Sequence, residues 1–203
     1  LQSSSAASDV YKRQRKDFPI LGKKVNNTDL IYFDNAATSQ TPNQVIDVIS
    51  SYYKENNSNI HRGLHSLSAD ATNKYENSRS IIKNHFGAAH DHEIIFTSGT
   101  THGINIISSG LEKLISSKDE LIVSEMEHHS NIVPWQMLCE KTGSKLKVIP
   151  INDDGTLDMD EYNSLLTPKV KFVFINHVSN TLGIVNPLKE ITVSYTHLRA
   201  HET

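Results

Sequence analysis

The chain has 203 residues and a formal net charge of −3 at pH 7, a length that suits one ordinary domain or a large piece of a bigger protein. The weakly acidic balance provides no basic field for nucleic acid or anionic lipid. The single cysteine, Cys139, excludes an internal disulfide framework and fits a reducing compartment. The longest apolar runs have strand length, so we expect no transmembrane helix and a cytoplasmic location.

The two ends of the sequence differ from its middle. Residues 1–15 are small and polar without a periodicity that could bury a face. Residues 193–203 interrupt an apparent helix start near Pro187. Both ends resemble translated sequencing-adapter read-through. We therefore predict non-native tails at 1–15 and 193–203 around an internal native segment at 16–192.

The first half of the native segment predicts two helices joined by a polar loop. A short apolar strand at 30–33 precedes a helix with Pro42 in its first turn. The loop 55–67 follows, and then a longer helix at 66–86. Gly87 directly after this helix is typical of a C-terminal stop.

Strands and helices alternate in the second half. The predicted elements are, in order, strand 93–97, helix 100–116, strand 120–124, helix 131–141, strand 145–149, helix 158–166 and strand 170–175. Strands separated by helix-length segments predict an α/β fold with a mostly parallel sheet and flanking helices. In open α/β sheets, ligands bind at the carboxyl ends of the strands.

Chemistry-bearing residues follow three of these strands. The turn at 98–101 (Ser-Gly-Thr-Thr) opens a helix, whose free N-terminal amides and Thr hydroxyls could bind a phosphate. The alternative is that Ser98 or Thr100 only caps that helix. His128 follows the next strand, and Asn180 follows the strand at 170–175. A phosphate turn, an imidazole that can stack on a ring and an amide that can bond a ring oxygen suit a phosphorylated aromatic cofactor.

Five motifs occur in a fixed order along the native segment. They are DNAATSQ at 34–40, HRGLHSLS at 61–68, GTTHGIN at 99–105, MEHHSNIVPWQ at 126–136 and HVSN at 177–180. In this order and spacing they resemble the SUF-type (group II) cysteine desulfurases, a branch of the class V aminotransferase superfamily that includes selenocysteine lyases. The resemblance covers about residues 17–192 and corresponds to roughly the first half of a family member.

This resemblance implies part of the large domain of a pyridoxal-phosphate-dependent transferase with the aspartate aminotransferase fold (fold type I). It implies that residues 16–192 form the N-terminal part of that domain. The implied reaction converts L-cysteine, or L-selenocysteine, to L-alanine and transfers the sulfur to an acceptor protein for iron–sulfur cluster assembly. The full-length protein is expected to be a homodimer.

The resemblance also implies roles for individual residues. Thr100 and Thr101 correspond to the positions that bind the phosphate of pyridoxal 5′-phosphate. His128 corresponds to the catalytic histidine that stacks on the pyridine ring and exchanges protons. Asn180 corresponds to the asparagine near the phenolic oxygen and the substrate carboxylate. The implied substrate-binding positions are Asn35, Ala36, His61 and Asn180.

Three parts of the family's catalytic apparatus are absent from this sequence. It contains no Ser-Gly-His-Lys context for the Schiff-base lysine and no Asp-x-Ala-Gln run. Cys139 lies in a predicted helix, where we expect it to pack rather than to accept sulfur. We therefore expect the chain by itself to be catalytically incomplete. His102 stands where the family usually has Glu, and we expect it to face solvent.

Two alternatives remain open. The chain could belong to another class V pyridoxal-phosphate enzyme, such as an epimerase or a kynureninase-like hydrolase, although the run 128–131 argues against this. It could also be a non-enzymatic His-rich metal-binding module, because it has eleven histidines. No HExxH or CxxC motif is present, so no metal site is predicted.

Overall fold

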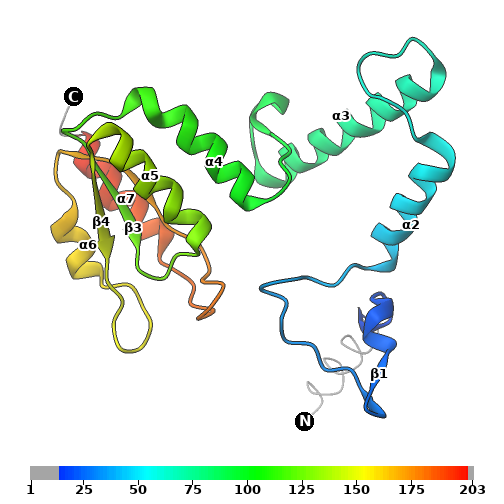
Figure 1. Cartoon of the computed structure of the whole chain (residues 1–203), viewed down its shortest axis with the longest axis horizontal. Helices are drawn as coiled ribbons and strands as arrows, with labels where there is room; N and C mark the ends of the chain where they lie inside the picture. Colours follow the sequence, from blue (N-terminus) through cyan, green and yellow to red (C-terminus); the bar gives the residue numbers. More distant parts are fainter. Residues whose placement is uncertain (1–13, 201–203) are drawn as a thin grey trace. The chain divides into compact units, whose positions relative to one another are not determined.

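The computed structural model describes residues 14–200, with only the backbone described for 197–200. The chain divides into two compact units, Leu1–Ile95 and Phe96–Thr203, called here the N-terminal unit and the C-terminal unit (Figure 1). The tail predicted at 1–15 lies outside the described residues except for Gln14 and Arg15, and its non-native origin stays a prediction.

The N-terminal unit consists of short elements followed by two helices. Its elements are η1 (Pro19–Gly22), β1 (Lys24–Val25), β2 (Thr28–Asp29), α2 (Asn43–Ser51), the π-helical η2 (Tyr52–Asn56), α3 (Ser66–Phe86) and η3 (Asp91–Glu93). β1 and β2 form an antiparallel hairpin. Its turn residues Asn26 and Asn27 both have positive φ, as a two-residue hairpin turn requires. The predicted helix 66–86 and its stop at Gly87 are confirmed.

The two strands predicted at 30–33 and 93–97 are wrong. Both segments are irregular backbone, and neither pairs with a strand among the described residues. Phe33 is 93% exposed and Ile95 is 70% exposed. An extended segment needs a neighbouring strand for its N–H and C=O groups, so apolar composition alone does not make it a strand.

A parallel three-stranded sheet forms the centre of the C-terminal unit. Its strands are β3 (Glu120–Ser124), β4 (Lys145–Ile149) and β5 (Val170–Phe174), in the order β4-β3-β5. All three confirm predicted strands. Every residue of β3 is buried, because this strand has a neighbour on each side and helices on both faces.

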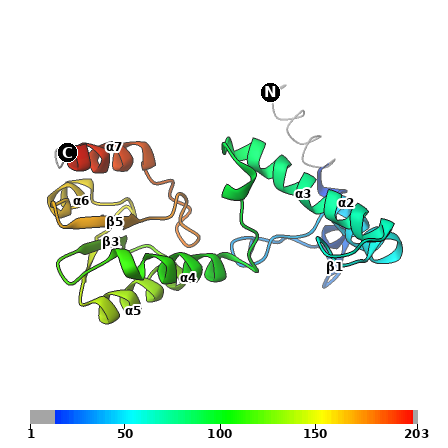
Figure 2. The same cartoon turned by 90° about the horizontal axis from the view of Figure 1, so that it is seen from above.

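Helices cover both faces of this sheet (Figure 2). One face carries α4 (Thr100–Leu111) with its extension η4 (Glu112–Leu114), and α5 (Val133–Thr142) preceded by η5 (His129–Asn131). The other face carries α6 (Met159–Leu165) and α7 (Leu188–Ala200). β3 supplies Leu121 and Val123 to the α4–α5 core and Ile122 to the α6–α7 core, as alternation along a strand requires.

Aromatic side chains fix the helices to the sheet. Trp135 of α5 is 1% exposed and stacks on Phe174 of β5, with ring centroids 3.6 Å apart. On the other face, the hydroxyl of Tyr162 donates to the carbonyl of Ile191 at 2.9 Å. Burial raises the pKa of Tyr162 to about 12. Trp135 thus packs α5 against β5, and Tyr162 joins α6 to α7.

The tail predicted at 193–203 continues α7 as far as Ala200. Its Tyr195 hydroxyl donates to the carbonyl of Lys171 in β5 at 2.6 Å. The remaining tail residues lie outside the described part of the chain, and the origin of the tail stays a prediction. None of the described helices combines the length and the apolar character that crossing a membrane requires.

Candidate cofactor site

The candidate site lies where the strands of the C-terminal unit end. α4 leads through η4 into β3, and Figures 1 and 2 show its N-terminal end on the same side of the sheet as the β3–α5 connection and the loop after β5. The hydroxyl of Ser108 in α4 donates to the carbonyl of Pro134 in α5 at 3.2 Å, which joins the two helices. The topology therefore places the turn before α4, His128 and the loop of Asn180 at one edge.

The turn before α4 leaves the helix N-terminus without a side-chain cap. Gly99 is the N-cap residue, with φ of 137°, and no side-chain oxygen caps the helix. The first helical bond runs from the N–H of Gly103 to the carbonyl of Gly99 at 3.1 Å. Capping by Ser98 or Thr100, the alternative considered from the sequence, is therefore wrong.

His102 belongs to the hydrogen bonds of this turn. Its ring is exposed, as expected, but its Nδ1 accepts the backbone N–H of Ser98 at 3.3 Å and lies 3.0 Å from the Ser98 hydroxyl. The expectation that His102 only faces solvent is corrected in this respect. The side chain braces the turn from the first turn of the helix.

The donors of this turn fit a phosphate group. The uncapped amides at the start of α4 and the hydroxyls of Thr100 and Thr101 are all able to donate, and both threonines are exposed. A Cβ added at Gly99 would meet no atom within 4 Å, so the space beside the turn is open. Donors at the positive end of a helix dipole, facing open space, are the chemistry that an anion needs.

His128 is held by the residues that follow it. Its Nδ1 accepts the backbone N–H of Ser130 at 3.1 Å and lies 2.9 Å from the Ser130 hydroxyl, so His128 caps η5. The ring is exposed. Because Nδ1 acts as an acceptor, Nε2 is the ring atom that holds the proton of the neutral imidazole. Nε2 is then the atom through which this side chain can exchange protons.

Asn180 lies at the tip of a loop that folds back on itself after β5. The loop is closed by hydrogen bonds from the N–H of Ser179 to the carbonyl of Ile184 and from the N–H of Asn186 to the carbonyl of His177, at 2.9 and 2.8 Å. Asn180 is exposed, and its amide nitrogen lies 3.3 Å from the Thr181 hydroxyl. The loop thus presents the amide to solvent from a defined backbone.

Glu127 joins the loops that carry His128 and Asn180, and the sequence analysis missed it. Its carboxylate is buried and accepts hydrogen bonds from the Ser124 hydroxyl at 2.6 Å, the Asn131 amide at 2.8 Å and the backbone N–H of Asn176 at 2.8 Å. The available sequence signal was an acidic residue three positions after the end of an apolar strand. A residue 49 positions away supplies one of its partners, and no spacing pattern reveals this.

The other predicted positions, Asn35, Ala36 and His61, belong to the N-terminal unit. Asn35 and Ala36 lie in an exposed turn that is closed by the N–H of Thr38 donating to the carbonyl of Asp34 at 3.0 Å. His61 has φ of 64°, and its Nε2 lies 2.7 Å from Oε1 of Glu76. Glu76 therefore orients the imidazole of His61.

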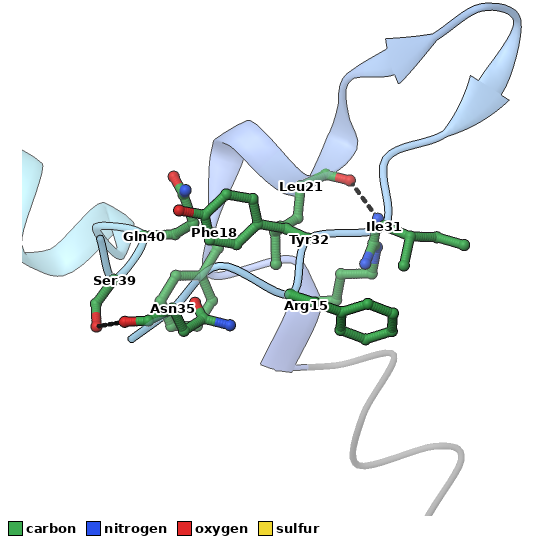
Figure 3. Close-up of a pocket in the computed structure, with 9 residues that line it drawn as sticks. Arg15, Phe18, Leu21, Ile31, Tyr32, Asn35, Ser39 and Gln40 are labelled. Atoms are coloured by element: carbon green, nitrogen blue, oxygen red, sulfur yellow. Dashed lines mark hydrogen bonds between the residues drawn. The ribbon is translucent and has the colours of Figure 1, made fainter. Parts of the chain in front are cut away.

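Asn35 also lines a cavity of about 520 Å³ in the N-terminal unit (Figure 3). Phe18, Leu21 and Tyr32 form its apolar wall. The guanidinium of Arg15 donates to the carbonyls of Leu21 and Leu30 beside it. The cavity thus combines an aromatic surface with the guanidinium group of Arg15.

Several histidines act as helix caps. His65 caps α3 by accepting the N–H of Ser68, and His90 forms a capping box with Glu93 at η3. His128 caps η5 in the same way. Within the described residues, no group of three or more His, Cys, Asp and Glu side chains is placed to hold a metal ion.

Cys139 packs in the α4–α5 core, as expected. It is 7% exposed and clusters with Trp135 and Leu138. Burial raises the pKa of its thiol, partly offset by a hydrogen bond with Ser144. A buried thiol with a raised pKa is a poor nucleophile.

Comparisons with known proteins agree with this architecture. A family model described as "Aminotransferase class-V" matches residues 31–199. A probable cysteine desulfurase of Staphylococcus epidermidis is 51% identical over 169 residues, which are 83% of this chain and 41% of the relative. A cysteine desulfurase of Escherichia coli is 45% identical over 185 residues, which are 90% of this chain and 46% of the relative.

Solved structures show the same fold. The apo cysteine desulfurase of Thermococcus onnurineus matches with a TM-score of 0.82 and 38% identity, over 90% of this chain and 44% of that one. The chain thus spans less than half the length of these two relatives and of this structure. The α/β fold predicted from the sequence is confirmed, as part of a larger fold. The match over 31–199, together with the parallel sheet and its flanking helices, shows that the chain belongs to the class V aminotransferase family.

Proposed function

We propose that this chain carries the cofactor-anchoring part of a pyridoxal-phosphate-dependent cysteine desulfurase. The observation that carries the proposal is the uncapped turn at Gly99, with open space beside it, at the edge of the sheet where β3 and β5 lead into the segments of His128 and Asn180. The relatives named as cysteine desulfurases, at 45–51% identity, support the choice of reaction within the family.

In this proposal, each group of the site has one task. Pyridoxal phosphate, when bound, supplies an electron sink for bond cleavage at the amino-acid substrate. The amides at 99–101 and the hydroxyls of Thr100 and Thr101 bind its phosphate. The ring of His128 lies against the pyridine, with Nε2 available to accept or donate a proton. Asn180 donates from its amide to the ring oxygen or the substrate carboxylate.

The substrate and partners follow from the same resemblance. We propose L-cysteine as substrate, with L-selenocysteine as the alternative, and a SUF-type enzyme that passes sulfur to an acceptor protein for iron–sulfur cluster assembly. Asn35, Ala36 and His61 are proposed to line the substrate entrance in a homodimer. A cytoplasmic location belongs to the same proposal.

We further propose that the chain by itself does not convert cysteine to alanine. Its one cysteine is buried, and no lysine has the sequence context expected for the Schiff base. Alanine released from L-cysteine by the 203-residue chain would contradict this.

Cofactor binding tests the proposed function directly. Titration of the ¹⁵N-labelled chain with pyridoxal 5′-phosphate should shift the amide resonances of Gly99, Thr100 and Thr101. Pyridoxal, which lacks the phosphate, should bind about tenfold more weakly, because it forgoes charge-assisted hydrogen bonds. Equal affinity for both compounds, or shifts elsewhere only, would refute the phosphate site.

A pair of isosteric variants provides the control. Thr101→Val removes one hydroxyl from the turn and should weaken binding of pyridoxal phosphate about fivefold, the worth of one hydrogen bond. Thr192→Val makes the same change in α7, where the hydroxyl donates to the carbonyl of Leu188. This control should leave the affinity unchanged.

A further inference from the structure

We propose that Glu127 is a positioning residue that fixes His128 and the 176–186 loop relative to each other. The proposal rests on the proposed function, because it assigns to Glu127 the task of keeping His128 and Asn180 at the spacing of one cofactor. Glu127 itself is 8% exposed, so it is withdrawn from any ligand in the open site.

The carboxylate of Glu127 ties together three parts of the C-terminal unit. Its Oε1 accepts from the hydroxyl of Ser124 at the end of β3 and from the backbone N–H of Asn176 just after β5. Its Oε2 accepts from the Asn131 amide at the end of η5. One side chain thus links the last residue of β3, the turn after His128 and the start of the 176–186 loop.

A second layer of hydrogen bonds fixes the direction of the first. The indole N–H of Trp135 donates to Oδ1 of Asn131 at 2.9 Å, so the Asn131 amide must point its NH₂ group toward Glu127. An indole nitrogen can only donate, and a backbone N–H can only donate. Both carboxylate oxygens must therefore act as acceptors.

The 176–186 loop is connected to the same network. Nδ2 of Asn186 donates to the carbonyl of Asn176 at 2.9 Å and to its side-chain oxygen at 2.7 Å. The N–H of Asn186 in turn donates to the carbonyl of His177. Asn176, whose N–H reaches Glu127, is therefore the point at which the carboxylate holds both ends of the loop that carries Asn180.

This arrangement predicts how an isosteric change would act. Glu127→Gln replaces one acceptor oxygen by an NH₂ group, which must then face either the Asn131 amide or the N–H of Asn176. In either orientation, two N–H donors would face each other inside the protein. A buried donor without an acceptor lowers the stability of the fold. We expect the loop of His128 and the 176–186 loop to move apart in this variant. The turn at 98–101 should keep its own hydrogen bonds.

The test compares Glu127→Gln with Glu125→Gln in the full chain. Glu125 is two residues away and exposed, and its Oε2 accepts the N–H of Ile151 at 3.2 Å without touching the 176–186 loop. In Glu127→Gln, we expect shifts of the amide resonances of His128 and of residues 176–180. The indole N–H resonance of the single tryptophan should shift as well, with unchanged far-UV circular dichroism. Glu125→Gln should leave these signals in place.

Ligand affinity separates positioning from general damage. Glu127→Gln should weaken binding of pyridoxal 5′-phosphate about tenfold, because the ring loses its aligned imidazole. Its affinity for inorganic phosphate, measured at the Gly99–Thr101 amides, should stay that of the wild type. Equal weakening of both ligands, or no change in either, would overturn the positioning role.

The same experiment keeps the two proposals apart. If wild-type chain binds neither ligand at Gly99–Thr101, the proposed function fails. The positioning role of Glu127 is then tested by the amide resonances of the Glu127→Gln variant alone. Joint shifts of His128 and residues 176–180 support the link between the loops, and shifts limited to 124–131 refute it.

Discussion

The two units of this chain contain similar apolar runs and treat them differently. In the C-terminal unit, Leu121 and Ile122 of β3 are 0% exposed. In the N-terminal unit, Ile31 is 73% exposed and Phe33 is 93% exposed. The difference lies in the neighbours, since β3 has a strand on each side and the run at 30–33 has none among the described residues. For these two runs, burial depends on the presence of neighbouring strands and not on local composition.

The helices of the N-terminal unit form even where their apolar residues are exposed. α2 forms where its sequence predicts a helix, although Val45, Ile46, Val48 and Ile49 on it are all exposed. A helix satisfies its backbone hydrogen bonds within its own segment, whereas a strand depends on another segment. Local signals therefore suffice for α2 and α3 and fail for the runs at 30–33 and 93–97.

The largest expected effect contrasts one buried and one exposed isoleucine. Ile122→Ala in β3 should lower the free energy of unfolding by about 2–5 kcal/mol, because it leaves a cavity in the α6–α7 core. Ile49→Ala, at a side chain 52% exposed, should change it by about 0.5 kcal/mol or less. Urea unfolding followed by circular dichroism measures both. Equal losses would mean that the apolar face of α2 is buried in solution.

A smaller effect is expected at the partly buried ion pair of Lys147 and Glu120 in the sheet. Lys147 lies 2.8 Å from Glu120, and its hydrogen bond holds the pKa of that carboxyl below the usual value of 4.5 despite the opposing effect of burial. Thr167 adds a second hydrogen bond. Glu120→Gln should cost about 1–3 kcal/mol at pH 7, the range for a buried polar partner that is lost.

The pH dependence of stability provides the check for this pair. Because the folded-state pKa of Glu120 is lowered, its contribution is present above pH 4.5 and is lost as the pH falls through the folded value. Wild-type stability should therefore fall more steeply than that of Glu120→Gln as the pH is lowered from 5. Parallel curves would show that the pair contributes nothing.

Helix caps provide the next contrast between the units. The carboxylate of Asp158 accepts the N–H of Glu161 at 2.9 Å and caps α6, whereas Nδ1 of His65 caps α3 at 3.4 Å. Asp158→Ala should cost about 1 kcal/mol. His65→Ala should cost less, because its bond is longer and an imidazole lacks the charge that complements the helix dipole. Thermal unfolding of both variants ranks them, and the reverse order would contradict this reasoning.

The smallest effect is expected for the half-exposed carboxylate of Glu76 in α3. Glu76 contacts His61 at 2.7 Å and Arg79 at 3.2 Å, and its side chain is 45% exposed. Glu76→Gln should change stability by less than about 1 kcal/mol, because solvent screens the half-exposed carboxylate. A loss as large as that of Glu120→Gln would show that the N-terminal unit is more tightly packed around His61 than its exposure indicates.

Sequence reasoning predicted the bounds of α3 correctly, because the stop at Gly87 is a local signal. The bounds of β3 and β4 also agree with the predicted ranges, because these two runs pair with neighbouring strands in the folded sheet. The positions of His128 after β3 and of Asn180 after β5 were also predictable, whereas Thr100 and Thr101 begin α4 behind a segment that is not the predicted strand. The roles of these residues stay predictions.

The hydrogen bonds that join these positions were beyond prediction. Glu127 reaches Asn176 across 49 residues, and His102 bonds to Ser98 through a ring rotamer that no pattern specifies. Such contacts depend on side-chain geometry after the strands have paired. Sequence patterns therefore located the groups of the site but not the side chain that links two of its loops.

Because Cys139 is buried, the single thiol of this chain can serve as a probe of local opening. With its side chain enclosed beneath α5 and its ionisation suppressed, alkylating reagents can reach it only when that helix lifts from the strands. The rate of modification in native buffer, relative to that in urea, would measure how often this layer opens.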